Sequence, residues 1–177
     1  MMKNLLLRIG LATALVCSAP SAFAQGKASQ DKAGQAFLKK AMEGNLAEVE
    51  MGKLAQQKGA SDGVRSFGKQ LEQDHAAAND KAAAVAKEMG MSPPTELNKK
   101  QKADYDRMSK LSGDKFDREF VKHMVADHKK DIKEFQREAK KTNERPSAFA
   151  QETLPTLQKH LETAESLQGK TGTTGSR

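Results

Sequence analysis

Cysteine is almost absent from this chain, since Cys17 is the only one among 177 residues. It lies in an amino-terminal segment that is predicted to be removed, which leaves a chain without thiols. Disulfides, thiolate metal sites and cysteine nucleophiles are therefore excluded from the processed protein. Tryptophan is absent and aromatic residues make up 5% of the chain. Because strands are enriched in aromatic and β-branched residues, this scarcity argues against a fold built on sheets.

The first 24 residues have the pattern of a secretory signal peptide. Lys3 and Arg8 form a basic start, the apolar run around 11–16 is too short to span a bilayer, and Ala-Phe-Ala at 22–24 is a small-x-small cleavage site. A lipoprotein signal around Cys17 is the alternative, but the valine before that cysteine is a poor fit. The sequence therefore predicts export, with a periplasmic protein or one peripherally associated with the cell envelope.

Size and charge narrow the class of protein further. Removing the first 24 of 177 residues leaves 153, which suits one domain with a real core. The whole chain has a formal net charge of +7, and the predicted signal carries two basic and no acidic residues, which leaves +5. Lysine and arginine alternate with acidic residues, as on a solvated surface. The pattern predicts no nucleic-acid partner, and it names no protein partner, oligomeric state or membrane ligand.

What the chain has in abundance is helix-forming residues. It is rich in Ala, Lys, Glu, Gln, Leu and Met, and its apolar residues recur with helical period. Residues 25–32 are a polar lead-in, 33–168 form the helical domain, and 169–177 are expected to be a disordered tail. Five helices are predicted, at about 32–58, 62–89, 95–111, 114–141 and 147–168.

The lengths of the connections predict the fold. Short turns join the first two long helices and the last two, whereas the middle connection is long and carries the short helix at 95–111. Two hairpins joined by one long crossover are typical of the ferritin-like version of a four-helix bundle. The sequence therefore predicts an all-α, ferritin-like antiparallel four-helix bundle with an extra helix in its crossover, and Pro155 is expected to kink the last helix.

Three of the four histidines lie on or beside an apolar helix face. At 100° per residue, His75 lies within the stripe of its helix and His128 is central to its own. His160 and Glu48 lie at stripe edges, and His123 is expected to face solvent or the crossover. Four of these residues fall close to the midpoints of four predicted helices, so a bundle would bring them to one level: Glu48, His75, His128 and His160.

This level predicts a metal site. Imidazole and carboxylate ligands suit Zn, Fe, Cu or Mn, and adjacent aspartates are candidates for further ligands or acceptors for ring N–H groups. The predicted ligands are Glu48, His75, His128 and His160, with Asp74, Asp127 and Asp131 around them. The alternative is a structural layer, in which each buried ring is satisfied by an aspartate or a carbonyl oxygen.

Catalysis has less support in the sequence than binding. No Ser-His-Asp motif and no glycine-rich phosphate loop is found, so no catalytic residues are predicted and the question of an enzyme stays open. Glu72 and His75 match the Glu-x-x-His spacing of di-iron bundles, but Glu72 lies outside the apolar stripe. Leu157 stands where the second such motif needs a glutamate, which argues against a di-iron centre.

Four segments together resemble a known family. They are Phe37-Leu38 with Glu48 to Ala55, Val64 to Asn79 with Asp74-His75, Phe116 to His128, and Ala148 to Leu161 with Leu154-Pro155 and His160. The chain is similar over about 33–168 to the bacterial exported family called domain of unknown function 4142. The resemblance implies a ferritin-like helical bundle secreted into the envelope, often labelled an outer-membrane protein, and it implies no established activity.

Two functional hypotheses follow from these observations. The first is a metal-binding bundle for storage, buffering or stress protection in the periplasm. The second is a non-enzymatic interaction module whose buried His and Asp layer sets the register of the helices. They differ in whether the imidazole nitrogens converge on one point or each turn to a separate acceptor.

Overall fold

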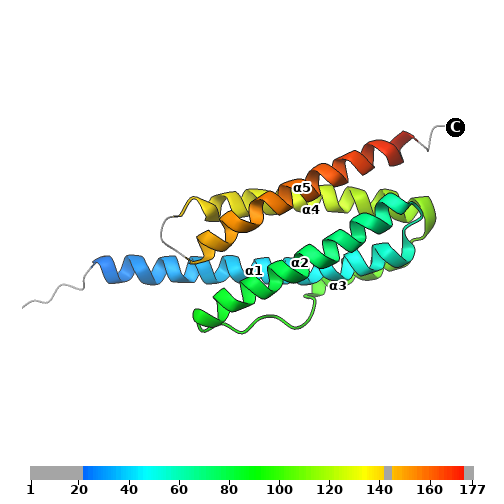
Figure 1. Cartoon of the computed structure of the whole chain (residues 1–177). Helices are drawn as coiled ribbons and strands as arrows, with labels where there is room; N and C mark the ends of the chain where they lie inside the picture. Colours follow the sequence, from blue (N-terminus) through cyan, green and yellow to red (C-terminus); the bar gives the residue numbers. More distant parts are fainter. Residues whose placement is uncertain (1–21, 142–144, 174–177) are drawn as a thin grey trace, which may run out of the picture.

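A computed structural model describes residues 22–141 and 145–173 of the chain. These residues form five α-helices and no strand (Figure 1), which confirms the predicted all-α class. The helices are α1 (Ala22–Lys58), α2 (Asp62–Glu88), α3 (Lys99–Ser109), α4 (Gly113–Ala139) and α5 (Arg145–Thr173). None of the described helices has the length and apolar character needed to cross a membrane.

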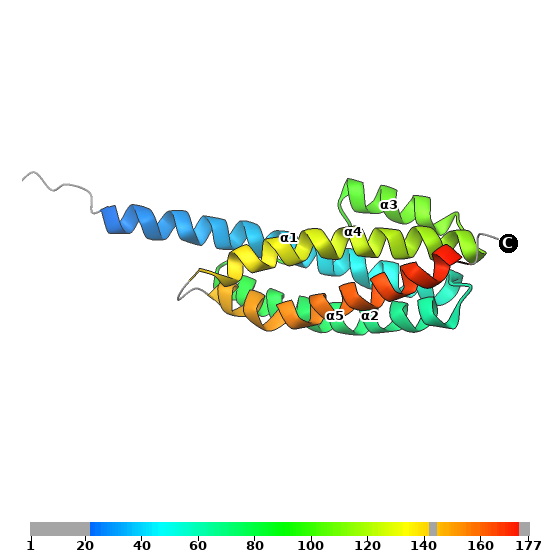
Figure 2. The same ribbon diagram turned by 90° about the horizontal axis from the view of Figure 1, so that it is seen from above.

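The four long helices form two hairpins that lie against each other. α1 packs mainly on α2, and α4 mainly on α5, while α2 also contacts α5. The connection from α2 runs back along the molecule, so that α4 starts at the end where α1 and α2 are joined (Figures 1 and 2). α3 lies in this crossover and contacts α1 and α4. α1 packs less extensively against α4 than against α2. This leaves room for the cavity described below.

Local sequence explains where the helices begin and end. The Ser61 hydroxyl accepts a hydrogen bond from the Val64 N–H at 3.3 Å, which caps the start of α2. Gly90 follows the end of α2 with a φ of 72°, a conformation that glycine adopts without steric cost. Asn98 and Gln101 form a reciprocal capping box at the start of α3.

Two helices extend past their predicted ends. α1 begins at Ala22, so the predicted polar lead-in is helical, and its amino end reaches beyond the other helices (Figure 2). α5 continues through Pro155 and ends at Thr173, past the predicted start of the tail at Gly169. Neither extension contains a proline. The rest of the predicted signal peptide and the last four tail residues lie outside the described residues.

α1 and α2 approach each other closely at a pair of glycines. A Cβ added at Gly52 would lie 2.5 Å from the Gly68 carbonyl oxygen, and one added at Gly68 would lie 2.7 Å from Ala55 Cβ. The two glycines therefore let the backbones meet where any larger side chain would separate them. This contact sets the position of α2 against α1 only a few turns from the buried histidine of α2.

The apolar core is divided into two clusters along the bundle. One includes Phe67, Phe120 and Met124 near the α1–α2 turn. The other includes Phe37 and Phe135 toward the opposite end. Buried polar residues occupy the level between the two clusters, where the sequence predicts the histidines to meet.

Candidate metal centre

A polar layer of five buried side chains separates the two apolar clusters. Each of the five is at most 4% exposed, and they come from α1, α2, α4 and α5: Asn45, Glu48, His75, His128 and His160. All four predicted ligands are thus buried at one level. His160, predicted at a stripe edge, is fully buried. Because polar groups lose hydration on burial, each of them needs a partner inside the protein.

The three histidines form a compact triad. Their ring centroids lie 5.7 Å apart for His75 and His128, 5.3 Å for His75 and His160, and 5.4 Å for His128 and His160. One nitrogen from each ring lies within 4.8 Å of the other two. The triad is the only such group of potential ligands among the described residues, and Glu48 is outside it.

Hydrogen bonds to the outside of the triad assign the tautomers of two rings. His128 Nδ1 lies 3.0 Å from the Met124 carbonyl oxygen, which can only accept, so this nitrogen carries the proton. His160 Nε2 lies 2.8 Å from Asp74 Oδ2, and an ionised carboxylate likewise only accepts. In neutral rings the other two nitrogens, His128 Nε2 and His160 Nδ1, then have free lone pairs.

These two lone pairs face each other. His128 Nε2 and His160 Nδ1 are 3.3 Å apart. With both outer nitrogens protonated, neither inner nitrogen has a hydrogen to donate, so the contact joins two acceptors. Such a contact is repulsive unless a cation stands between the nitrogens or one ring changes its protonation. The geometry therefore calls for a positive charge at the centre of the triad.

The third ring completes this arrangement. His75 Nδ1 lies 2.9 Å from Asn45 Oδ1, and as the donor of this bond it leaves Nε2 with a lone pair. His75 Nε2 is buried without a hydrogen-bond partner. A buried acceptor without a partner loses its hydrogen bonds to water, and no hydrogen bond within the protein replaces them. All three rings thus have an outer nitrogen held by the protein and an inner nitrogen left free.

Burial keeps the rings neutral, as metal ligands must be. Burial lowers the pKa of His75 well below its usual range, and its two histidine neighbours lower it further. Burial, followed by the field of His160, lowers the pKa of His128 to about 4. Burial also lowers the pKa of His160, although Asp74 opposes this shift through its hydrogen bond. Three neutral imidazoles can therefore share one small volume near neutral pH.

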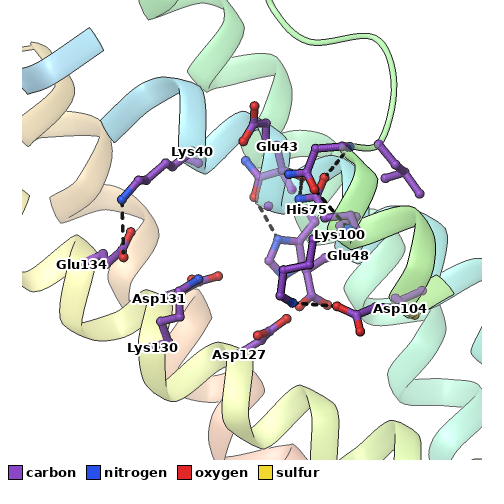
Figure 3. Close-up of a pocket in the computed structure, with 18 of the residues that line it drawn as sticks. Lys40, Glu43, Glu48, His75, Lys100, Asp104, Asp127, Lys130, Asp131 and Glu134 are labelled. Carbon is purple, nitrogen blue, oxygen red and sulfur yellow. Dashed lines mark hydrogen bonds and ion pairs between the residues drawn. The ribbon is translucent and has the colours of Figure 1, made fainter. Parts of the chain in front are cut away.

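Glu48 lies beside the triad, on a cavity of about 340 Å³ between α1, α3 and α4. Figure 3 shows this cavity, with Glu48 and His75 on its wall. Burial raises the pKa of the Glu48 carboxyl well above its usual range, and the negative charges of Asp127 and Asp131 raise it further. Glu48 Oε2 is also buried without a partner. The sequence therefore identified a buried, perturbed carboxyl group, but not one inside the triad.

The predicted aspartates have separate roles. Asp74 accepts from His160 rather than from its neighbour His75. Asp127 pairs with His123 at 3.4 Å, and Asp131 lies on the cavity wall with Glu48. His123 lines the same cavity, next to the crossover helix, and takes no part in the triad.

Two groups that hold the histidines were not predicted from the sequence. Asn45 holds His75, and the Met124 carbonyl holds His128. Asn45 gives a signal in the sequence, because it interrupts an apolar stripe. The Met124 carbonyl gives none, since any residue supplies one. Glu72 accepts from Gln56 at 2.7 Å and is not part of the layer, as its position on the helix predicts.

Comparison with known proteins gives a family but no function. A family model described as Domain of unknown function (DUF4142) matches residues 18–167, which confirms the resemblance found in the sequence. No curated protein and no solved structure matches the chain. The role of the triad must therefore be argued from its geometry.

Proposed function

Because the chain belongs to the family Domain of unknown function (DUF4142), whose description assigns no activity, we propose a function from the triad alone. The protein binds one transition-metal ion on His75, His128 and His160. It is an exported bacterial envelope protein in which a ferritin-like four-helix bundle holds this ion for storage, buffering or stress protection. The observation that carries the proposal is the pair of inward lone pairs on His128 and His160.

Known metal geometry supports this proposal. Zinc binds histidine nitrogen at about 2.0–2.1 Å in tetrahedral sites, which places two ligand nitrogens about 3.3–3.4 Å apart. The inner nitrogens of His128 and His160 are 3.3 Å apart. The third nitrogen is within 4.8 Å of them, so a movement of at most about 1.5 Å by His75 closes the site around an ion. The outer bonds to Asp74, Asn45 and the Met124 carbonyl are the kind that orient metal-bound imidazoles.

The donor set favours particular metals. Three neutral imidazoles suit Zn²⁺, Cu²⁺, Fe²⁺ or Ni²⁺, and thiolate is not available for a softer site. Three protein ligands also leave at least one coordination position of a tetrahedral ion for water or another ligand. A metal held in this way is exchangeable, which fits storage or buffering better than a closed structural site.

Matched histidine variants test the proposal. The full chain is loaded with Zn²⁺ or Co²⁺, dialysed and assayed for bound metal and for cobalt absorption. We expect one ion per wild-type chain and at least a tenfold loss of affinity in His128→Ala and His160→Ala. His123→Ala is the control, since it removes a histidine from α4 without touching the triad. Equal metal binding by all of these variants would rule the proposal out.

A structural layer is the second candidate. The observation in its favour is that each outer nitrogen already has an acceptor in the protein. On this view the protein is a non-enzymatic periplasmic interaction module, and His75→Leu folds with equal or higher stability because it removes an unpartnered buried nitrogen. The structural-layer view also expects that the wild type retains no metal. Urea unfolding and metal analysis of the same samples separate the two candidates.

Export is tested separately. The basic start, apolar run and cleavage motif at 1–24 support it. Expression of the full chain in a bacterium, followed by fractionation and amino-terminal sequencing, should give a periplasmic protein that begins at Gln25. A cytoplasmic protein that retains Met1 would contradict the proposed location without affecting the metal site.

A further inference from the structure

The cavity beside the triad carries more negative charge than its basic residues offset. Its wall includes six carboxyl groups, from Glu43, Glu48, Asp104, Asp127, Asp131 and Glu134. Figure 3 shows these groups around one space, together with Lys40, Lys100 and Lys130. We call this space the acidic cavity.

The lysines reach the acidic cavity from the protein surface. Lys100 binds Asp104 at 2.7 Å, and Lys40 lies 3.9 Å from Glu134. Both lysine side chains are largely exposed. Lys130, also exposed, lies 3.6 Å from its neighbour Asp131. These pairs are at the surface, where ion pairs are weak and screened.

Three of the carboxyl groups have weaker partners or none. Glu48 is 4% exposed, and its Oε2 has no hydrogen-bond partner. The partner of Asp127 is His123, which carries charge only when protonated. Burial raises the pKa of Asp131 to about 6 despite Lys130. Natural cores rarely leave such groups unsatisfied without a ligand, ion or water.

The spacing of the carboxyl groups indicates what kind of ligand fits. Among the described residues they do not form a compact group like that of the histidines. Direct coordination by all of them is therefore not favoured. A hard divalent cation such as Mg²⁺ keeps several of its waters and is held by one or two carboxylates. The cavity volume of about 340 Å³ accommodates roughly ten waters at about 30 Å³ each, which is ample for a hydrated ion.

We propose that the acidic cavity binds a hydrated divalent cation through Glu48, Asp127 and Asp131, as a site separate from the histidine triad. Oxygen ligands select Mg²⁺, Ca²⁺ or Mn²⁺, whereas the imidazoles select later transition metals. The cation offsets the repulsion among the three carboxylates. Glu48 thus serves the cavity and not the triad, and the two sites lie on either side of His75.

The chain provides its own reporter for this site. Tyr105 is the only tyrosine, there is no tryptophan, and Tyr105 lines the acidic cavity. Tb³⁺ prefers oxygen ligands, and its luminescence is sensitised by a tyrosine only over a short range. Excitation of the full chain at the tyrosine band should therefore give Tb³⁺ emission from the cavity, and excess Mg²⁺ or Ca²⁺ should remove it.

Variants then locate the signal. Glu48→Gln and Asp127→Asn should raise the apparent Kd for Tb³⁺ at least tenfold. Asp106→Asn, beside Tyr105 but paired with Lys102 on the surface, should leave the Kd unchanged. Circular dichroism checks that each variant folds. Tyr105→Phe should lose the emission while Mg²⁺ binding, measured by calorimetry, remains.

The outcomes separate this proposal from the proposed function. His160→Ala should keep the Tb³⁺ signal and lose Zn²⁺. Absence of sensitised emission in the wild type, or emission that depends on Asp106 instead of Glu48, overturns the cavity site while Zn²⁺ binding to the triad is unaffected. Loss of the signal in His160→Ala, with the fold intact, overturns the separation of the two sites.

Discussion

In each histidine of the triad, one ring nitrogen is hydrogen-bonded to an acceptor outside the triad, and the other faces the neighbouring rings. This division is set by acceptors of three kinds: a carbonyl oxygen at Met124, a carboxylate at Asp74 and an amide at Asn45. Because none of these acceptors lies between the rings, the proposed metal ion would take that position. Burial lowers the pKa of all three rings, so a metal ion meets less competition from protons there than at exposed histidines.

The lowered pKa of His128 predicts that the metal-free protein loses stability in acid. The pKa of His128 is about 4 in the folded state, against an ordinary value of 6.5. Between these two pH values His128 is therefore protonated in the unfolded chain and neutral in the folded protein. The stability from neutral His128 is complete above pH 6.5 and is lost as the pH falls toward 4. A shift of this size corresponds to at most about 3 kcal/mol.

Urea unfolding at several pH values, with chelator present, measures this effect. Between pH 7.5 and 4.5 the free energy of unfolding of the wild type should fall by about 2 kcal/mol more than that of His128→Leu. Glu48 and Asp131, whose raised pKa values act in the opposite direction, are common to both proteins and cancel in the difference. Parallel pH profiles for the two proteins would show that His128 is not held neutral by the fold.

At the scale of the element, the α1–α2 pair positions the layer. Asn45 and Glu48 on α1 face His75 on α2 only if the two helices keep their register. The contact of Gly52 with Gly68 fixes that register, because a Cβ at Gly52 would lie 2.5 Å from the Gly68 carbonyl oxygen. Backbone atoms cannot rotate away as a flexible side chain can. An added methyl group must therefore push the helices apart.

Two glycines of α1 give a matched prediction. Gly52→Ala should destabilise the protein by about 1–3 kcal/mol through overpacking. Gly44→Ala should stabilise it by about 0.5–1 kcal/mol through helix propensity, since the nearest atom that the added Cβ would meet, Asp131 Oδ2, is 3.9 Å away. Thermal or urea unfolding of both variants measures the difference. Similar effects for the two variants would contradict the close contact between α1 and α2.

At the scale of the whole molecule, the polar layer divides the core. Apolar clusters on either side of it supply the burial that stabilises the bundle. The layer itself contributes unpartnered atoms, which cost stability. The triad spans α2, α4 and α5, so an ion bound there links both hairpins.

Metal should therefore stabilise the entire bundle. At Zn²⁺ concentrations 100 times the Kd, binding to the folded state alone adds about 2.7 kcal/mol, which should appear as one cooperative shift in Tm. Chelator should reverse the shift, and His160→Ala should abolish it. Calorimetric scans with and without Zn²⁺ measure this. An equal shift in His160→Ala would assign the stabilisation to some other site.

Much of this arrangement is predictable from local pattern. The helical period predicts five helices, and their midpoints place Glu48, His75, His128 and His160 near one level, where the structure buries all four. The pattern also excludes His123 and Glu72 from the layer. It is less accurate for α1, where Glu48, predicted at the edge of the apolar stripe, is buried while its neighbour Val49 is only half-buried. A rotation of α1 by a few tens of degrees exchanges these neighbours, and helix periodicity alone does not resolve such a rotation.

The sequence by itself determined the helical class, the hairpin boundaries and the level of the histidines, because these depend on propensity, capping and a period of 100° per residue. Only the tertiary structure decided that three rings converge while Glu48 turns to a cavity. Ring orientation depends on acceptors from other helices, such as Asp74 for His160. The cavity depends on how far α1 and α4 separate. Both are distances between elements, which no pattern within a single helix contains.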